Sequence, residues 1–292
     1  MSILQSIWLG IVQGITEFLP VSSSGHLSIL QNIFHVETDG GMLFDIMLHV
    51  GTLLAVFVVY HRDIWKMIVE ALKMAADICF NLKTWFQNRI HKTALRYRRI
   101  VHNNYRKFVV LVLVSTVPTG IIGVLGKDLI SNASETLLIP GLCLLITGVL
   151  LLMADTVREG NKLPRQITYL DGILIGAAQG LATLPGLSRS GTTIAVCLLC
   201  GIDRRFAVKY SFILSIPAIL GAAVLEIKDV IAKPVEMNTI GIYAVGMVFA
   251  AVVGYICIKT MLVVVRKKKF KYFSWYCFAV GALAIGGHFF LQ

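Results

Sequence analysis

The sequence predicts an all-α integral membrane protein with six transmembrane helices and two re-entrant helix-loop-helix hairpins, arranged as an inverted-topology repeat. Composition is the first observation: 57% of the 292 residues are hydrophobic and only 15% are charged, whereas soluble domains average about 25% charged residues. The second observation is a set of long apolar segments, and the third is an internal duplication. We therefore treat residues 1–292 as a single membrane domain in the membrane bilayer.

Six segments are apolar enough to cross a bilayer, which takes about 17–25 residues in a helix. They are residues 42–60, 108–126, 137–153, 210–225, 239–265 and 272–291. Two more apolar regions, 1–35 and 169–201, are interrupted midway by Pro, Gly and Ser. Irregular backbone at membrane depth is tolerated only where it is buried in protein or lines a cavity. The interrupted regions are therefore predicted to be hairpins that enter the membrane and return on the same side.

The two predicted hairpins are copies of each other. A shift of 166 residues aligns "GIVQGITEFLPVSSSG" with "GAAQGLATLPGLSRSG" without a gap. The identical pairs are Gly10/Gly176, Gln13/Gln179, Gly14/Gly180, Ser22/Ser188, Ser24/Ser190 and Gly25/Gly191. Each copy is followed by three spans, so the first repeat covers 1–153 and the second 169–292. Because three is odd, the second copy is inverted, and such repeats bring their functional residues together near the bilayer midplane.

Basic residues orient the predicted topology. Most of the 27 Lys and Arg residues fall in 61–107, 154–168, 201–209 and 266–271, which the topology places on one face. By the positive-inside rule this face is cytoplasmic, and both termini are outside. The 61–107 segment is predicted to be a basic cytoplasmic loop attracted to anionic lipid headgroups. RNA binding is the less favoured alternative, so no nucleic-acid partner is predicted.

Ionisable side chains inside membrane segments are functional candidates by default, because burying them is costly. Glu17, His26 and Arg189 sit at the interruptions of the two hairpins and are the favoured candidates. The others, Asp45, His49 and Asp171, lie near predicted span or hairpin ends, where a hydrated polar residue is ordinary. We therefore give these three less weight.

Each interruption leads into a new helix, with Ser22 or Ser23 as the N-cap in the first hairpin and Ser188 in the second. Capping does not account for three consecutive serines or for the adjacent Arg189. Free N–H groups, hydroxyls and an arginine at a helix N-terminus suit a phosphate. Two such termini facing each other would enclose one polyanion.

The two copies differ at the positions that carry chemistry. The 166-residue shift places Ser23 on Arg189, Glu17 on Thr183 and His26 on Thr192. One copy therefore holds acid–base groups and the other holds the cation. This difference predicts one composite site with a reactive half and an anchoring half.

The segments "QGITEFLPVSSSGH" and "PGLSRSGTT" resemble the two signature motifs of the bacterial undecaprenyl-diphosphatase family, also called bacitracin-resistance proteins. The resemblance covers essentially the whole chain. It implies hydrolysis of a C55 isoprenyl diphosphate lipid to the monophosphate, which recycles the carrier lipid for cell-wall synthesis. It also implies a divalent cation, Mg²⁺ or Ca²⁺, and a site in the bacterial cell membrane that opens to the extracytoplasmic side. The oligomeric state stays open, with a homodimer as one option.

The combined interpretation assigns a role to each residue. Arg189 is expected to bind the phosphate, Ser23 to be the nucleophile, Glu17 to be general base or metal ligand, and His26 to be general acid. Gln13 is a second, weaker candidate metal ligand. The remaining predicted phosphate contacts are Ser22, Ser24, Gly25, Ser188, Ser190, Gly191 and Thr193.

Three alternatives remain open at this point. His26 could be the nucleophile and form a phosphohistidine, or water could attack directly. A carrier that flips isoprenyl phosphate lipids would need the same anion site. The Glu–Ser–His cluster in only one half favours an enzyme, because a carrier needs binding groups but no acid–base pair.

Overall fold

The chain folds into a helical membrane protein. A computed structural model describes residues 1–33, 42–92, 94–134, 136–231 and 237–291, and these form helices and no sheet. Residues 34 and 35 of the first predicted hairpin, Thr93 in the predicted basic loop and Gln292 lie outside the described residues. The helices are α1 (Ile3–Phe18), α2 (Ser23–Ile33), α3 (Met42–His91), α4 (Asn104–Leu125), α5 (Lys127–Ser134), α6 (Leu138–Thr156), α7 (Tyr169–Leu181), α8 (Arg189–Leu199), α9 (Arg204–Ile231), α10 (Met237–Arg266) and α11 (Phe270–Leu291).

The predicted spans fall on six of these helices, apart from the capping residues Gly126 and Leu137. Five helices in the described part of the chain are long and apolar enough to cross a membrane, so the chain is a multi-pass membrane protein. They are Leu43–His91, Asn104–Leu125, Leu138–Thr156, Arg204–Leu225 and Met237–Arg266. The sixth predicted span lies within α11, which is not one of these five. A count of six spans therefore stays a prediction, and so does the re-entrant arrangement.

The two hairpins have matching helix boundaries. Moving α2 by 166 residues reproduces the bounds of α8, and α1 and α7 begin at equivalent residues. The predicted caps are also confirmed. Ser188 precedes α8, and its hydroxyl accepts the Gly191 N–H at 3.2 Å, while Ser22 precedes α2 and accepts the Gly25 N–H at 3.4 Å.

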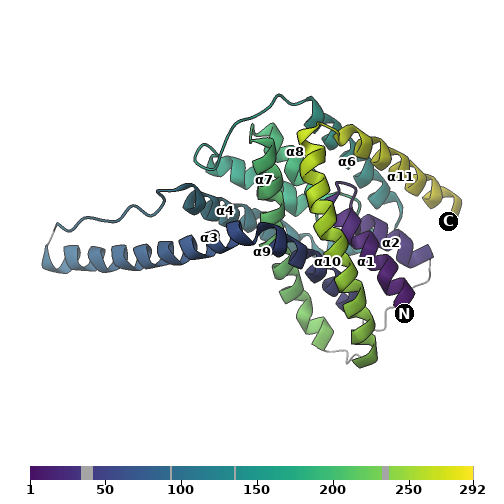
Figure 1. Ribbon diagram of the computed structural model, residues 1–292, viewed down its shortest axis with the longest axis horizontal. Helices are drawn as coiled ribbons and strands as arrows, with labels where there is room; N and C mark the ends of the chain where they lie inside the picture. The colour runs from purple at the N-terminus through teal and green to yellow at the C-terminus, as the bar shows by residue number, and fades with distance from the viewer. Residues whose placement is uncertain (34–41, 93, 135, 232–236, 292) are drawn as a thin grey trace.

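Each hairpin packs its first helix on a span from the other half of the chain. Helix α1 lies along α10, and α7 lies along α4 (Figure 1). A glycine makes each contact close. A Cβ on Gly10 would collide with the Gly246 carbonyl oxygen, and one on Gly176 with the Ser115 carbonyl oxygen. Since Gly10 and Gly176 are equivalent in the repeat, the same packing device serves both halves.

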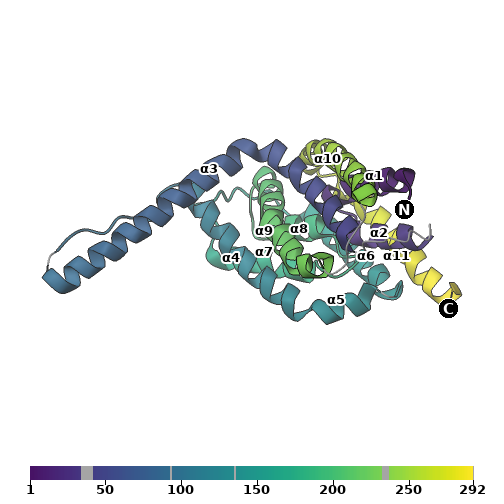
Figure 2. The same ribbon diagram turned by 90° about the horizontal axis from the view of Figure 1, so that it is seen from below.

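The segment predicted as a basic loop, 61–107, is largely helical, which corrects that prediction. Helix α3 continues to His91, with non-helical torsion angles at Tyr60 (φ −106°, ψ 18°). The strongly apolar stretch ends near Tyr60, where the predicted span also ends. The residues that follow include good helix formers, so the helix continues beyond the span. The arm, defined as residues 61–92 and 94–103, comprises this second part of α3 and the segment that returns to α4. It projects from the rest of the molecule in both views (Figures 1 and 2).

Candidate active site

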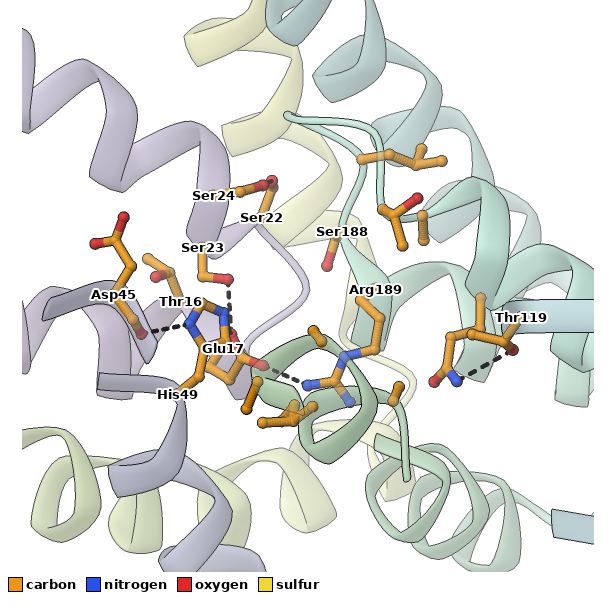
Figure 3. A pocket seen from close by; sticks show the side chains of 18 of the residues that line it. Thr16, Glu17, Ser22, Ser23, Ser24, Asp45, His49, Thr119, Ser188 and Arg189 are labelled. Carbon is orange, nitrogen blue, oxygen red and sulfur yellow. Dashed lines mark hydrogen bonds and ion pairs between the residues drawn. The ribbon is translucent and has the colours of Figure 1, made fainter. Parts of the chain in front are cut away.

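The two hairpin tips meet in a pocket of about 460 Å³, within the range of small-molecule sites. The end of α1, the start of α2 and the first turns of α3 form one wall. The start of α8 forms the opposite wall, and the later part of α9 closes the pocket (Figure 3). Residues from both halves of the chain therefore line one cavity.

The carboxylate of Glu17 is the centre of this pocket. Glu17 belongs to the last turn of α1, and its side chain is only 5% exposed. Ser23 Oγ donates a hydrogen bond to Glu17 Oε2 at 2.7 Å, and Gln13 Nε2 donates to the same oxygen at 3.0 Å. The Arg189 guanidinium forms an ion pair with the other oxygen, Oε1 (Figure 3). One buried carboxylate thus joins the serine of the first half to the arginine of the second.

Arg189 has donor capacity left for a ligand. Its Nη2 contacts Glu17, whereas its Nη1 is buried without a hydrogen-bond partner among the described residues. A buried guanidinium N–H that lacks an acceptor is costly. A phosphate oxygen in the pocket would satisfy this group, and arginine is well suited to bind phosphate.

Backbone geometry sets the shape of both tips. Ser22 has a φ of 71°, in the left-handed region that is uncommon for a residue other than glycine. This turn places Ser23 at the start of α2, where its hydroxyl reaches Glu17. In the second hairpin Gly186 has a φ of 88°, and a Cβ there would collide with the carbonyl oxygen of Pro140 in α6. The backbone of the second tip therefore packs against α6 just before Ser188.

The structure brings about half of the predicted site residues to the pocket. The lining includes Glu17, Ser22, Ser23, Ser24, Ser188 and Arg189. The residues that do not line the pocket are Gln13, Gly25, His26, Ser190, Gly191 and Thr193. The N–H groups of Gly25 and Gly191 bond to the capping serines. Thr193 Oγ1 bonds to the Arg189 carbonyl oxygen at 2.8 Å, which supports the turn that carries Arg189.

His26, predicted as the general acid, does not line the pocket. Its Nδ1 lies 2.7 Å from the Ser22 carbonyl oxygen, and its Nε2 lies 2.7 Å from the Tyr276 hydroxyl of α11. The His26 ring also stacks on Tyr276. Its position connects the first tip to α11, and its catalytic role stays a prediction.

Two polar residues that the sequence analysis weighted less lie in the pocket, namely Asp45 and His49 of α3 (Figure 3). His49 Nε2 is 3.8 Å from Glu17 Oε2, and its Nδ1 lies 2.8 Å from the Asp45 carbonyl oxygen. Their spacing of four residues, which places both on one helix face, could have indicated this pair. By contrast, Asp171 lies in the first turn of α7, where it forms a capping box with Thr168, the N-cap of that helix.

Thr16, Thr119, Gln179 and Thr183 complete the polar lining, and the sequence analysis did not select them as site residues. Gln179 Nε2 contacts Thr119 Oγ1 at 3.3 Å, and Gln179 Oε1 is buried without a hydrogen-bond partner among the described residues. Gln179 is the repeat equivalent of Gln13. The internal alignment was therefore the signal that could have identified it.

A divalent cation would have to share its ligands with a substrate. The described residues contain no group of three or more His, Cys, Asp or Glu side chains that could hold a metal ion. Two carboxylates, Glu17 and Asp45, line the pocket. Mg²⁺ is commonly bound by one or two carboxylates together with substrate phosphate oxygens. The pocket fits a cation of this kind once a diphosphate is bound, whereas Gln13 points its Nε2 toward Glu17 and does not line the pocket.

Comparison with known proteins agrees with these features. A family model described as bacitracin resistance protein BacA matches residues 6–283. The chain is 41% identical to the undecaprenyl-diphosphatase of Alkaliphilus metalliredigens, with 98% of each chain covered. It is 38% identical to the protein of the same name from Halothermothrix orenii and 38% identical to that from Methanobrevibacter smithii, again with 98% of each chain covered.

Proposed function

Because the chain belongs to the bacitracin resistance protein BacA family, we propose that it hydrolyses undecaprenyl diphosphate to undecaprenyl phosphate and inorganic phosphate. This activity recycles the lipid carrier for cell-wall synthesis and accounts for bacitracin resistance. The observation that carries the proposal within the molecule is the position of Glu17. Its carboxylate contacts the Ser23 hydroxyl from one half of the chain and the Arg189 guanidinium from the other.

The arrangement supports a serine nucleophile with a carboxylate base. A hydroxyl 2.7 Å from a buried carboxylate has the geometry of an activated nucleophile. The Ser23 oxygen attacks the terminal phosphorus as its proton passes to Glu17. A bond from Ser23 Oγ to phosphorus forms, and the bond from phosphorus to the bridging oxygen breaks. Undecaprenyl phosphate leaves, and water then releases inorganic phosphate from the serine.

Arg189 supplies the electrostatic half of the reaction. Phosphoryl transfer depends mainly on positioning and on stabilising the charge of the transferred group. The incoming phosphate competes with Glu17 for the guanidinium and bonds to Nη1, the donor that is otherwise unsatisfied. Release of Glu17 from this ion pair increases its ability to accept the Ser23 proton.

A divalent cation, Mg²⁺ or Ca²⁺, would be held by Asp45 together with diphosphate oxygens, and it would neutralise charge on the leaving phosphate. Glu17 would be a ligand only in the alternative in which it is not the base. The pocket is lined by the first turns of α3 and the later part of α9. The distribution of basic residues puts these segments toward the extracytoplasmic side. We therefore propose that the diphosphate enters from that side.

The test is phosphate release by the purified protein from a long-chain isoprenyl diphosphate, with and without Mg²⁺ or Ca²⁺. Arg189→Ala is expected to lower turnover by about 100- to 1000-fold, the usual effect of removing one charge-stabilising contact. Lys127→Ala, at the start of α5 and exposed, is the control cation and should retain activity. Normal turnover by Arg189→Ala would contradict the composite site. Binding without phosphate release by wild type would favour the lipid carrier instead.

A second experiment identifies the nucleophile. Denaturing the enzyme during turnover with substrate labelled in its terminal phosphate is expected to trap the label on Ser23. An acid-labile label on His26 would support the phosphohistidine route instead. Absence of a covalent label, combined with retained activity of Ser23→Ala, would favour direct attack by water.

A further inference from the structure

The arm carries a row of exposed apolar side chains that the catalytic site does not use. Along the second part of α3, Trp65, Leu72, Cys79 and Phe86 recur every seven residues. Ile68, Ala75 and Leu82 repeat at the same interval, three positions further on. This spacing places all seven on one stripe of a helix. Trp65 and Leu72 are each 67% exposed and Phe86 is 56% exposed, so the described chain does not cover the stripe.

The opposite face of the helix is covered by the returning segment. Asn81 exchanges two hydrogen bonds with the backbone of Arg98, both at 2.8 Å. Asn88 does the same with Leu95, at 3.0 and 2.9 Å. Cys79 is two positions from Asn81, which corresponds to about 200° around a helix. The stripe therefore points away from the returning segment.

All three acidic residues of the arm are already paired within the chain. Asp63 pairs with Lys209, and Glu70 pairs with Lys73 and Arg106. Asp77 pairs with Arg98 and Arg106.

Several cations of the arm, in contrast, have no ion pair in the described part of the chain. Arg62, Lys83 and Arg89 are exposed and belong to this group, and Lys83 follows Cys79 by one turn along the stripe. The exposed surface of the arm is thus apolar and positively charged.

We propose that the arm lies along the surface of the bilayer from which it emerges, with the apolar stripe between anionic phospholipid headgroups and acyl chains. A helix with an apolar face and flanking Lys and Arg binds membranes in this way, and anionic lipids attract each nearby cation. The arm also begins at the Tyr60 kink, where the predicted span ends, so its first turns start at the bilayer surface.

A second copy of the chain is the competing occupant, because apolar residues with a seven-residue period can form a coiled coil. Charge argues against it. Two such arms would place like charges side by side, and all three carboxylates of each arm are already paired within its own chain. An anionic leaflet provides the missing negative charge. This inference does not depend on the proposed hydrolysis.

Cys79 provides a native probe for the test, since the other five cysteines are buried or half-buried. A fluorophore sensitive to its environment is attached to Cys79 of the full-length protein carrying Cys200→Ala. The labelled protein is reconstituted in vesicles of phosphatidylcholine alone or mixed with phosphatidylglycerol, each with spin-labelled lipid as quencher. The control probe is on Arg96→Cys in a Cys79→Ser, Cys200→Ala background, on the returning segment.

With phosphatidylglycerol, the Cys79 probe is expected to shift to shorter wavelength and to be quenched by the spin-labelled lipid, whereas the Arg96→Cys probe is not. Lys83→Glu with Arg89→Glu should reduce this quenching while phosphate release stays unchanged. Each lost cation should weaken docking about fivefold, equivalent to ~1 kcal/mol. Equal quenching in both lipids, or none in either, would overturn the proposal. Efficient cross-linking between Cys79 residues of two copies would assign the stripe to a dimer and overturn it as well.

Discussion

Glu17 binds two partners at once, one from each half of the chain, and this shared contact explains the divergence of the two repeats. If Glu17 contacted only Arg189, the two would form a structural ion pair. If it contacted only Ser23, the hydroxyl would have a base but no arginine nearby to bind the phosphate. Because the repeat places a serine in one half where the other has an arginine, both reach the same carboxylate. Substrate binding at Arg189 is thereby coupled to the basicity of Glu17 toward Ser23.

His49 is the residue-scale prediction. A general acid or base must lie within reach of the reacting groups, and His49 lies in the pocket whereas His26 does not. Loss of such a group typically costs about 100-fold or more, so His49→Gln is expected to lower kcat by about that factor and to alter the pH profile. His61→Gln is the matched control, because His61 is exposed on the same helix with a similar backbone hydrogen bond.

The kcat values of His49→Gln and His26→Gln show which of the two histidines turnover requires. Full activity of His49→Gln together with inactive His26→Gln would support the assignment made from the sequence. It would also require His26 to leave Tyr276 and turn toward the pocket during turnover. The measurement is kcat for both variants across the pH range in which wild type is active.

Residue-scale prediction from sequence succeeded where the chemistry was local. Ser23, Glu17 and Arg189 stand out as polar interruptions in apolar helices, and the structure brings them together. It was incomplete where proximity is tertiary. Asp45 and His49 look like ordinary residues near a span end, and only the packing of α3 against α1 places them in the same pocket as Glu17.

At the scale of helices, glycines determine how closely each hairpin approaches its span. Gly176→Ala would push a methyl group against the Ser115 carbonyl oxygen, which backbone packing cannot easily relieve. The expected cost is about 1–3 kcal/mol of stability, with a lower thermal midpoint in detergent and reduced activity. Gly120→Ala on α4 has no neighbouring atom within 4 Å, and it should be neutral or stabilising because alanine favours helix. Equal midpoints for the two variants would contradict this close packing.

Element boundaries were predictable wherever capping and hydropathy agreed. The serine caps gave the starts of α2 and α8, and the repeat gave equivalent bounds for both. The arm was missed because hydropathy detects the end of a span but not the end of a helix. Asn81 and Asn88 form hydrogen bonds to the backbone of the returning segment. Their partners are not neighbours in the sequence, so no local sequence pattern predicts these contacts.

At the scale of the whole molecule, the two halves exchange their hairpins. Helix α1 packs on α10 and α7 packs on α4, so neither half can form its own hairpin environment without the other. This exchange explains why a duplicated chain has one composite pocket rather than two equivalent ones. It also follows that a change at either hairpin interface should affect the whole site.

The predicted inverted topology specifies which loops face each side of the membrane. The test uses two introduced cysteines, one before α4 and one after it. The variants are Arg96→Cys and Lys127→Cys, each in a Cys79→Ser background. A membrane-impermeant thiol reagent is expected to label Lys127→Cys in intact cells and Arg96→Cys only in inside-out vesicles. The physical reason is the positive-inside rule, which places the basic arm in the cytoplasm. Labelling of both from one side would mean that α4 does not cross the membrane, and reversed labelling would place the diphosphate pocket on the cytoplasmic side.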